Sequence, residues 1–138
     1  EVCTQRRQAI KLADHSGFKG VTRHFLPRLL SNASLANEEL ISDVFKMADE
    51  IGRLGFVRQQ TAILGRRDQT ETLANFKAPL LVLCGAYDVL TPPPLSVEIA
   101  NMSSNSVLHM LDGIGHLSPL EAPSEVTRAL NELFERIC

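Results

Sequence analysis

An unbroken run of apolar residues at positions 80–84 constrains the fold of this 138-residue chain more than any other feature. The run stands between Pro79 and Gly85 and shows no alternation with polar residues. Such a run is typical of a strand that is buried on both faces, as in a parallel sheet covered by helices. A short helix is expected over residues 95–102, and a second strand is expected over residues 107–111.

The last part of the chain carries the clearest helical stripe. Apolar residues recur there at a spacing of three and four, at Val126, Ala129, Leu130, Leu133, Phe134 and Ile137. Strand, helix, strand and helix in this order predict an α/β fold in which parallel strands are joined by right-handed crossovers. Two strands alone leave backbone edges unpaired, so we expect them to belong to a larger sheet. A missing segment or a second copy of the chain would supply the rest.

Residues 1–76 are predicted to be helical throughout. Asn37 is a good cap for a helix that ends near Gly52 or Gly55, and another helix is expected over residues 56–64. Residues 18–30 also show apolar side chains at helical spacing, although Pro27 must bend or restart that helix. The boundary between this helical segment (residues 1–76) and the strand-containing part (residues 77–138) is therefore placed at Lys77.

Composition excludes several classes of protein and partner. Hydrophobic residues make up 44% and charged residues 22% of the chain, as in an ordinary soluble globular domain. No apolar run approaches the roughly 18 residues of a membrane span, and the basic residues are scattered, so neither a membrane nor nucleic acid is an expected partner. Three distant cysteines, Cys3, Cys84 and Cys138, predict no disulfide framework, no metal site and a reducing cytoplasmic location.

Two side chains beyond the predicted strands have the chemistry of an acid–base pair. Asp88 follows the first strand in a loop that Gly85 opens, and His116 follows the second strand between glycines. Loops beyond the carboxyl ends of parallel strands meet at one rim of a sheet. A carboxylate there can orient an imidazole that acts as general base. The alternative is that Asp88 caps a turn and His116 is an ordinary loop histidine.

The residues around this pair resemble the C-terminal part of the α/β-hydrolase family. The resemblance rests on the segment from Pro79 through Gly-Ala-Tyr-Asp88 to Thr-Pro-Pro and on Gly-Ile-Gly-His116-Leu-Ser-Pro-Leu-Glu-Ala-Pro123. It implies that Asp88 and His116 are the acid and the histidine of a catalytic triad that uses no metal or cofactor. Residues 1–76 are similar to the helical lid of that family. Arg66-Arg67-Asp68 is similar to the subgroup of enol-lactone and carboxylic ester hydrolases.

The chain departs from the family in one respect, because it contains no G-x-S-x-G nucleophile turn. The resemblance implies that the nucleophile and the oxyanion hole lie upstream, so we expect a hydrolase fragment that is inactive alone. Cys84 is the one candidate nucleophile near the site, but its place in an apolar strand favours a buried structural thiol. Ser118 and Glu121 are expected to form a capping box.

The resemblance implies a hydrolase of a small ester or lactone that works through a Ser-His-Asp triad. Dehalogenases, lyases and C–C bond hydrolases share the same acid–histidine pair, so the sequence does not name the substrate. An alternative of another class is a non-catalytic interaction module that self-associates through its exposed strand edge. In that case the chain forms a homo-oligomer, and Asp88 and His116 are relics.

Overall fold

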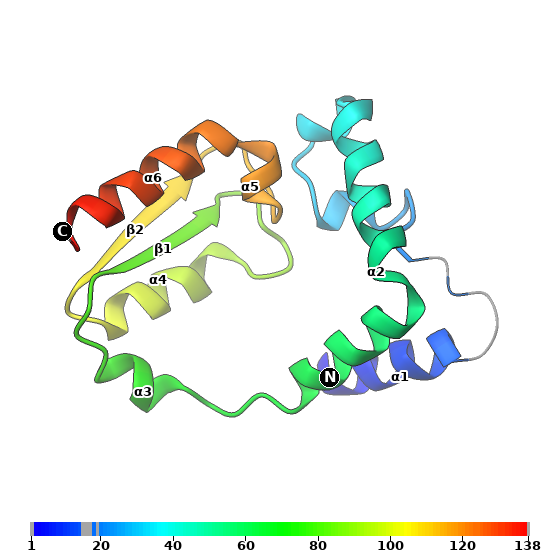
Figure 1. The fold of residues 1–138 in the computed structure, drawn as a ribbon, viewed down its shortest axis with the longest axis horizontal. Coiled ribbons are helices and arrows are strands. Elements are labelled where there is room, and N and C mark those ends of the chain that lie inside the picture. The colour runs from blue at the N-terminus through cyan, green and yellow to red at the C-terminus, as the bar shows by residue number, and fades with distance from the viewer. Residues whose placement is uncertain (1, 15–17, 19, 138) are drawn as a thin grey trace.

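The computed structural model describes residues 2–14, 18 and 20–137. The elements in chain order are α1 (Val2–Asp14), the 3-10 turns η1 (Leu26–Arg28) and η2 (Ser34–Ala36), α2 (Glu38–Leu64), α3 (Thr70–Ala74), β1 (Leu80–Gly85), α4 (Pro93–Met102), β2 (Ser106–Leu111), α5 (Ser118–Glu121) and α6 (Pro123–Glu135). Figure 1 shows β1 and β2 together with α4 and α6, and α1 and α2 beside each other on the opposite side of the molecule. None of the described helices combines the length and the apolar character that crossing a membrane requires.

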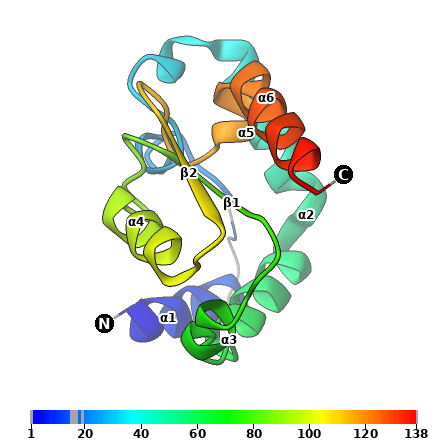
Figure 2. The same ribbon diagram turned by 90° about the vertical axis from the view of Figure 1, so that its left-hand side faces the viewer.

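The sheet has the predicted parallel arrangement. β1 and β2 pair in register from Leu80 with Ser106 to Gly85 with Leu111. α4 packs against both strands and α6 packs against β1, and the two helices cover opposite faces of the sheet (Figure 2). Within the described residues β2 is the only strand that pairs with β1, so the other edge of β1 has no strand partner there. The α/β class and the flanking helices are therefore confirmed.

Local residues determine where helix α2 begins and where it is interrupted. The Asn37 side chain accepts hydrogen bonds from the backbone N–H groups of Glu39 and Leu40, both at 3.1 Å, and so caps α2 as predicted. Gly52 interrupts α2 with a φ of 58° and a ψ of −176°, which places the break at the first of the two predicted glycines. α1 packs against α2 (Figure 1).

The helix predicted over residues 18–30 is wrong. Within the described part of that range, the helical residues are Leu26–Arg28 alone. They form one 3-10 turn, and Pro27 lies inside it. Pro27 has no N–H to donate to a preceding turn. Backbone groups just beyond it, the carbonyl of Leu29 and the N–H of Ser31, are hydrogen-bonded to the chain that follows β2. Those long-range bonds replace the bonds that a continuing helix would need.

A cluster of buried apolar side chains lies in the helical segment and extends into the strand-containing part. Its buried members are Leu26, Leu30, Ile41 and Val44. Leu117 and Leu120, which follow β2, pack against this cluster. Within the helical segment, residues 65–69 between α2 and α3 are exposed and form neither helix nor strand, so the prediction of helix throughout residues 1–76 is wrong there.

Candidate active site

The two strands end at the same level, and the loops after them lie side by side. Gly85 and Leu111 are register partners at the carboxyl ends of the strands. Beyond them, the N–H of Ala86 donates to the carbonyl of Leu111 at 2.8 Å, and the N–H of Tyr87 donates to the carbonyl of Ile114 at 2.9 Å. This rim of the sheet is the place where open α/β folds bind ligands.

Asp88 and His116 meet at this rim. Nδ1 of His116 lies 2.8 Å from Oδ2 of Asp88. An ionised carboxylate only accepts hydrogen bonds, so Nδ1 carries the proton and donates it. The Asp88 side chain is 5% exposed, whereas that of His116 is 32% exposed. Nε2 of His116 has no hydrogen-bond partner in the described part of the chain, which leaves it available for proton transfer.

Asp88 is held by residues that follow it directly. Its Oδ1 accepts the N–H groups of Leu90 and Thr91 at 2.8 and 2.9 Å, and its Oδ2 accepts the Thr91 hydroxyl at 2.7 Å. Asp88 therefore caps a turn with one oxygen and pairs with His116 through the other. Burial alone would raise the pKa of Asp88, but the hydrogen bonds from Thr91, His116 and Leu90 together hold it below its ordinary value. The carboxylate is thus ionised at neutral pH.

His116 is held by residues far away in the sequence. The N–H groups of His116 and Leu117 both donate to the carbonyl of Leu29, at 3.0 and 3.1 Å. The N–H of Gly115 donates to Oε1 of Glu121 at 3.0 Å. The backbone that carries the imidazole therefore rests against the helical segment. In this respect the two members of the pair differ.

Two glycines permit an unusually close stack of backbone behind the site. A Cβ atom at Gly85 would collide with the carbonyl groups of Ile114 and Gly115. A Cβ atom at Gly115 would lie 2.7 Å from the nitrogen of Ser31 and 2.8 Å from the carbonyl carbon of Leu30. The end of β1, the loop that carries His116 (residues 112–117, the histidine loop) and the helical segment are thus in direct backbone contact.

The predicted capping box at Ser118 and Glu121 is wrong. Ser118 lies inside α5, and the residue before it makes no side-chain cap. The Glu121 carboxylate instead accepts the N–H of Ser31 at 2.8 Å and that of Gly115. The carboxylate is used here because both N–H donors, at Ser31 and Gly115, are shielded from water and need an acceptor inside the protein.

Sequence reasoning missed three supports of the pair, namely Thr91, Leu29 and the bridging role of Glu121. A Thr three residues after an Asp is a recognisable Asx-turn pattern, so Thr91 had a local signal. The contact between Ser31 and Glu121 spans 90 positions and has no local signal.

A nucleophile facing Nε2 is absent from the described residues. Cys84 is 4% exposed, and its Sγ lies 3.3 Å from the carbonyl oxygen of Gly85 and 3.9 Å from that of Thr91. It is a buried thiol, as predicted, and its Sγ is directed to these two carbonyl oxygens. The nearby hydroxyl of Thr91 lies 3.4 Å from Nδ1, on the Asp88 side of the ring. Among the described residues, the rim thus holds a carboxylate paired with an imidazole and no nucleophile beside them.

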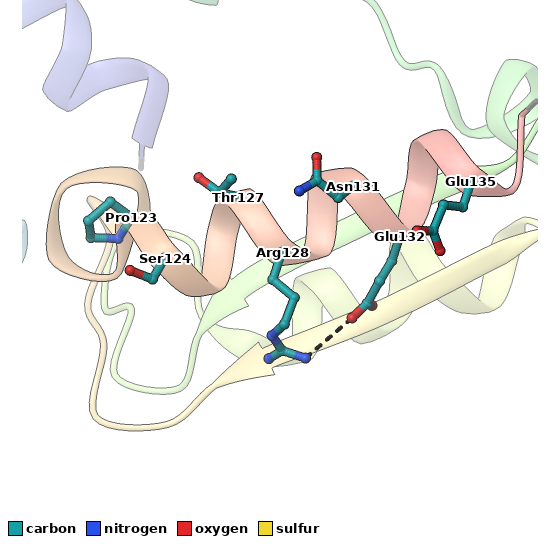
Figure 3. A pocket seen from close by; sticks show the side chains of 7 residues that line it. All are labelled: Pro123, Ser124, Thr127, Arg128, Asn131, Glu132 and Glu135. Carbon is teal, nitrogen blue, oxygen red and sulfur yellow. Dashed lines mark hydrogen bonds and ion pairs between the residues drawn. The ribbon is translucent and has the colours of Figure 1, made fainter.

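Neither of two surface hollows includes the pair. One, of about 590 Å³, is lined by residues of α6 alone, where Arg128 and Glu132 form an ion pair at 3.3 Å (Figure 3). Glu132 also lies 3.3 Å from Nε2 of His109. The other, of about 360 Å³, lies between the helical segment, at Leu30, and the strand-end loops, at Tyr87. Among the described residues, no group of three His, Cys, Asp or Glu side chains is placed to hold a metal ion.

Comparison with known proteins shows the same fold. The structure matches a thermophilic esterase from Thermogutta terrifontis with a TM-score of 0.89 and 26% identity, over 98% of this chain and 50% of that one. It matches the enol-lactonase from Burkholderia xenovorans LB400 with a TM-score of 0.82 and 19% identity, over 97% and 50%. It also matches MGS-M2, an α/β-hydrolase from a deep-sea metagenome library, with a TM-score of 0.72 and 18% identity, over 97% and 50%.

One relative is similar in sequence to this chain over a shorter stretch. The non-heme bromoperoxidase BpoC of Mycobacterium tuberculosis is 36% identical over 63 residues, which are 46% of this chain and 24% of that protein. No protein-family model matches the chain. The chain spans about half the length of the solved structures that it resembles. The resemblance to α/β-hydrolases expected from the motifs around Asp88 and His116 is therefore confirmed.

Proposed function

We propose that this chain, which has the α/β-hydrolase fold over about half the length of its structural neighbours, carries the acid and the base of a hydrolase site. The observation that carries the proposal is the 2.8 Å contact between Asp88 and His116 at the strand ends, with Nε2 left open. Asp88 and His116 are thus proposed as catalytic residues. The serine nucleophile and the oxyanion hole belong to a part of the protein outside this chain.

In the proposed reaction, Nε2 of His116 takes the proton of the serine hydroxyl as the serine oxygen attacks the carbonyl carbon of the substrate. The imidazolium then gives this proton to the leaving alcohol, and the acyl-enzyme remains. Next, Nε2 takes a proton from water, whose oxygen attacks the acyl carbon, and returns it to the serine as the acid is released. Asp88 fixes the tautomer and stabilises the imidazolium in both steps.

The proposed substrate is a small ester or lactone. The esterase and the enol-lactonase among the structural neighbours support this class. Residues 1–76 are proposed to act as a lid over residues 77–138, because their buried cluster and the carbonyl of Leu29 lie directly against the histidine loop. Cys3 and Cys84 are free thiols, which supports a reducing, cytoplasmic location, while Cys138 lies outside the described residues.

The test is hydrolysis of p-nitrophenyl butyrate by the 138-residue chain and by the longer protein that supplies the nucleophile. We expect no turnover above buffer from the chain alone. In the longer protein, His116→Ala is expected to lower kcat about a thousandfold or more, whereas His24→Ala, at an exposed turn, should leave it unchanged. Near-normal turnover of the His116→Ala variant would contradict the assigned role.

A second candidate function is self-association without catalysis. It is favoured by the unpaired edge of β1 and by large apolar side chains that are exposed on α6 and the residues after it, with Phe134 and Ile137 both 58% exposed. Light scattering at micromolar concentration distinguishes the two. A dimer that persists in the longer protein favours the interaction module, whereas a strictly monomeric chain contradicts it.

A further inference from the structure

Glu121 joins two stretches of backbone that lie far apart in the sequence. Its Oε1 accepts the N–H of Gly115 at 3.0 Å, and its Oε2 accepts the N–H of Ser31 at 2.8 Å. One stretch carries His116, and the other belongs to the helical segment. We call this pair of hydrogen bonds the Glu121 bridge.

Both donors of the Glu121 bridge are shielded from water. Ser31 is 5% exposed and Gly115 is buried, so each N–H needs an acceptor inside the protein. A carboxylate suits this place because both of its oxygens accept and neither donates. A glutamine of the same size would turn an N–H donor toward one of the two backbone N–H groups.

The Glu121 bridge is one of two sets of hydrogen bonds that hold the backbone around His116. In the other set, the carbonyl of Leu29 accepts the N–H groups of His116 and Leu117. Leu117 also packs against the buried cluster of the helical segment. Three hydrogen bonds between residues 29–31 and 116–121, together with the bond from Gly115 to Glu121, thus act on the backbone from which the imidazole projects.

We propose that Glu121 is a positioning residue, which sets the orientation of His116 toward Asp88 by tying the histidine loop to the helical segment. The inference rests on the proposed function, in which His116 is the base. Its consequence is that docking of the helical segment and alignment of the acid–base pair are one event. A lid that lifts would therefore loosen the base as well as open the site.

The test compares Glu121→Gln with Glu125→Gln in the isotopically labelled 138-residue chain. Glu125 is an exposed residue of α6 and serves as the matched control. The signal to follow is the Nδ1 proton of His116 in its hydrogen bond to Asp88. In Glu121→Gln we expect this proton to exchange with solvent about tenfold faster or more, since its backbone support is weakened. The pKa of Asp88, read from its carboxyl carbon, should rise toward its ordinary value.

An unchanged His116 proton and an unchanged Asp88 titration in a folded Glu121→Gln variant would overturn the inference. If that variant fails to fold, hydrogen exchange of the unmodified chain decides instead. In that experiment three protons should exchange with solvent at a common opening rate: the backbone N–H protons of Ser31 and Gly115 and the Nδ1 proton of His116. Independent exchange of these protons contradicts the inference. Absence of the His116–Asp88 hydrogen bond from the unmodified chain would instead count against the proposed function.

Discussion

The loop that carries Asp88 (residues 86–92, the acid loop) and the histidine loop are held at the same rim of the sheet by different contacts. Asp88 is held within a single turn, by the backbone of Leu90 and Thr91 and by the Thr91 hydroxyl. His116 is held by the helical segment, through Leu29 and the Glu121 bridge. A locally held carboxylate should survive a disturbance that displaces the base. The four predictions below test this difference.

The largest effect is expected from removing the most buried side chain of the helical segment. Leu26 is 2% exposed, so Leu26→Ala should lower the free energy of unfolding by about 2–5 kcal/mol, measured by urea denaturation. Leu12→Ala, at a side chain that is 73% exposed, should cost less than about 0.5 kcal/mol. Hydrogen exchange should accelerate at the N–H of His116 and not at that of Thr91. Equal acceleration at both would show that the two loops are not independent.

A smaller effect is expected from crowding the backbone stack at the histidine loop. Gly115→Ala places a methyl group 2.7 Å from the nitrogen of Ser31 and should cost about 1–3 kcal/mol of unfolding free energy. Gly65→Ala is the control, because its methyl group would lie 3.7 Å from the nearest carbonyl oxygens. Thermal unfolding of both variants measures the difference. Equal stability of the two variants would mean that the backbone at Ser31 can move away from the added methyl group without a loss of free energy.

The opposite disturbance acts on the acid loop alone. Thr91→Val removes the hydroxyl that donates to Asp88 at 2.7 Å but keeps the backbone donors, so it should cost about 1 kcal/mol. The pKa of Asp88, followed by carbon NMR, should rise, because one hydrogen bond to the ionised form is lost. Thr91→Ser should restore it. Hydrogen exchange at the N–H groups of Ser31 and Gly115 should not change. An increase there would show that the acid loop and the histidine loop are not held independently.

The smallest effect is expected from acid, because burial of Asp88 opposes the hydrogen bonds that lower its pKa. A lowered pKa in the folded state means that ionised Asp88 contributes its full stability above the ordinary value of 3.8. That contribution is lost as the pH falls through the lower folded value. Denaturation curves from neutral to acidic pH should show this loss in the wild-type chain. In Asp88→Asn this part of the pH dependence should be missing, and its persistence would assign it to other carboxyl groups.

Sequence reasoning succeeded where the cause of a structure is local. The apolar run of β1 and the cap at Asn37 each depend on a few neighbouring residues, and each was predicted. The break of α2 falls at Gly52, which is one of the two glycines predicted for it. The meeting of Asp88 and His116 followed from the parallel order of their strands.

It failed where a distant partner competes for the same group. Apolar spacing over residues 18–30 predicted a helix, but the backbone near Ser31 is bonded to the chain after β2. Glu121 has the spacing of a capping box with Ser118, yet its carboxylate bonds to Ser31 and Gly115. Neither outcome is encoded within a window of a few residues, because loop closure over such distances depends on the whole fold.

The exposed stretch at residues 65–69, near the end of the helical segment, has a practical consequence. The helical segment contacts the chain after β2 through Leu29, Ser31 and the packed cluster, and none of those contacts involves residues 65–69. A break in the polypeptide there would remove a tether without removing an interface. The two resulting peptides would then be candidates for a split reporter, in which the return of the His116–Asp88 hydrogen bond signals that the halves have come together.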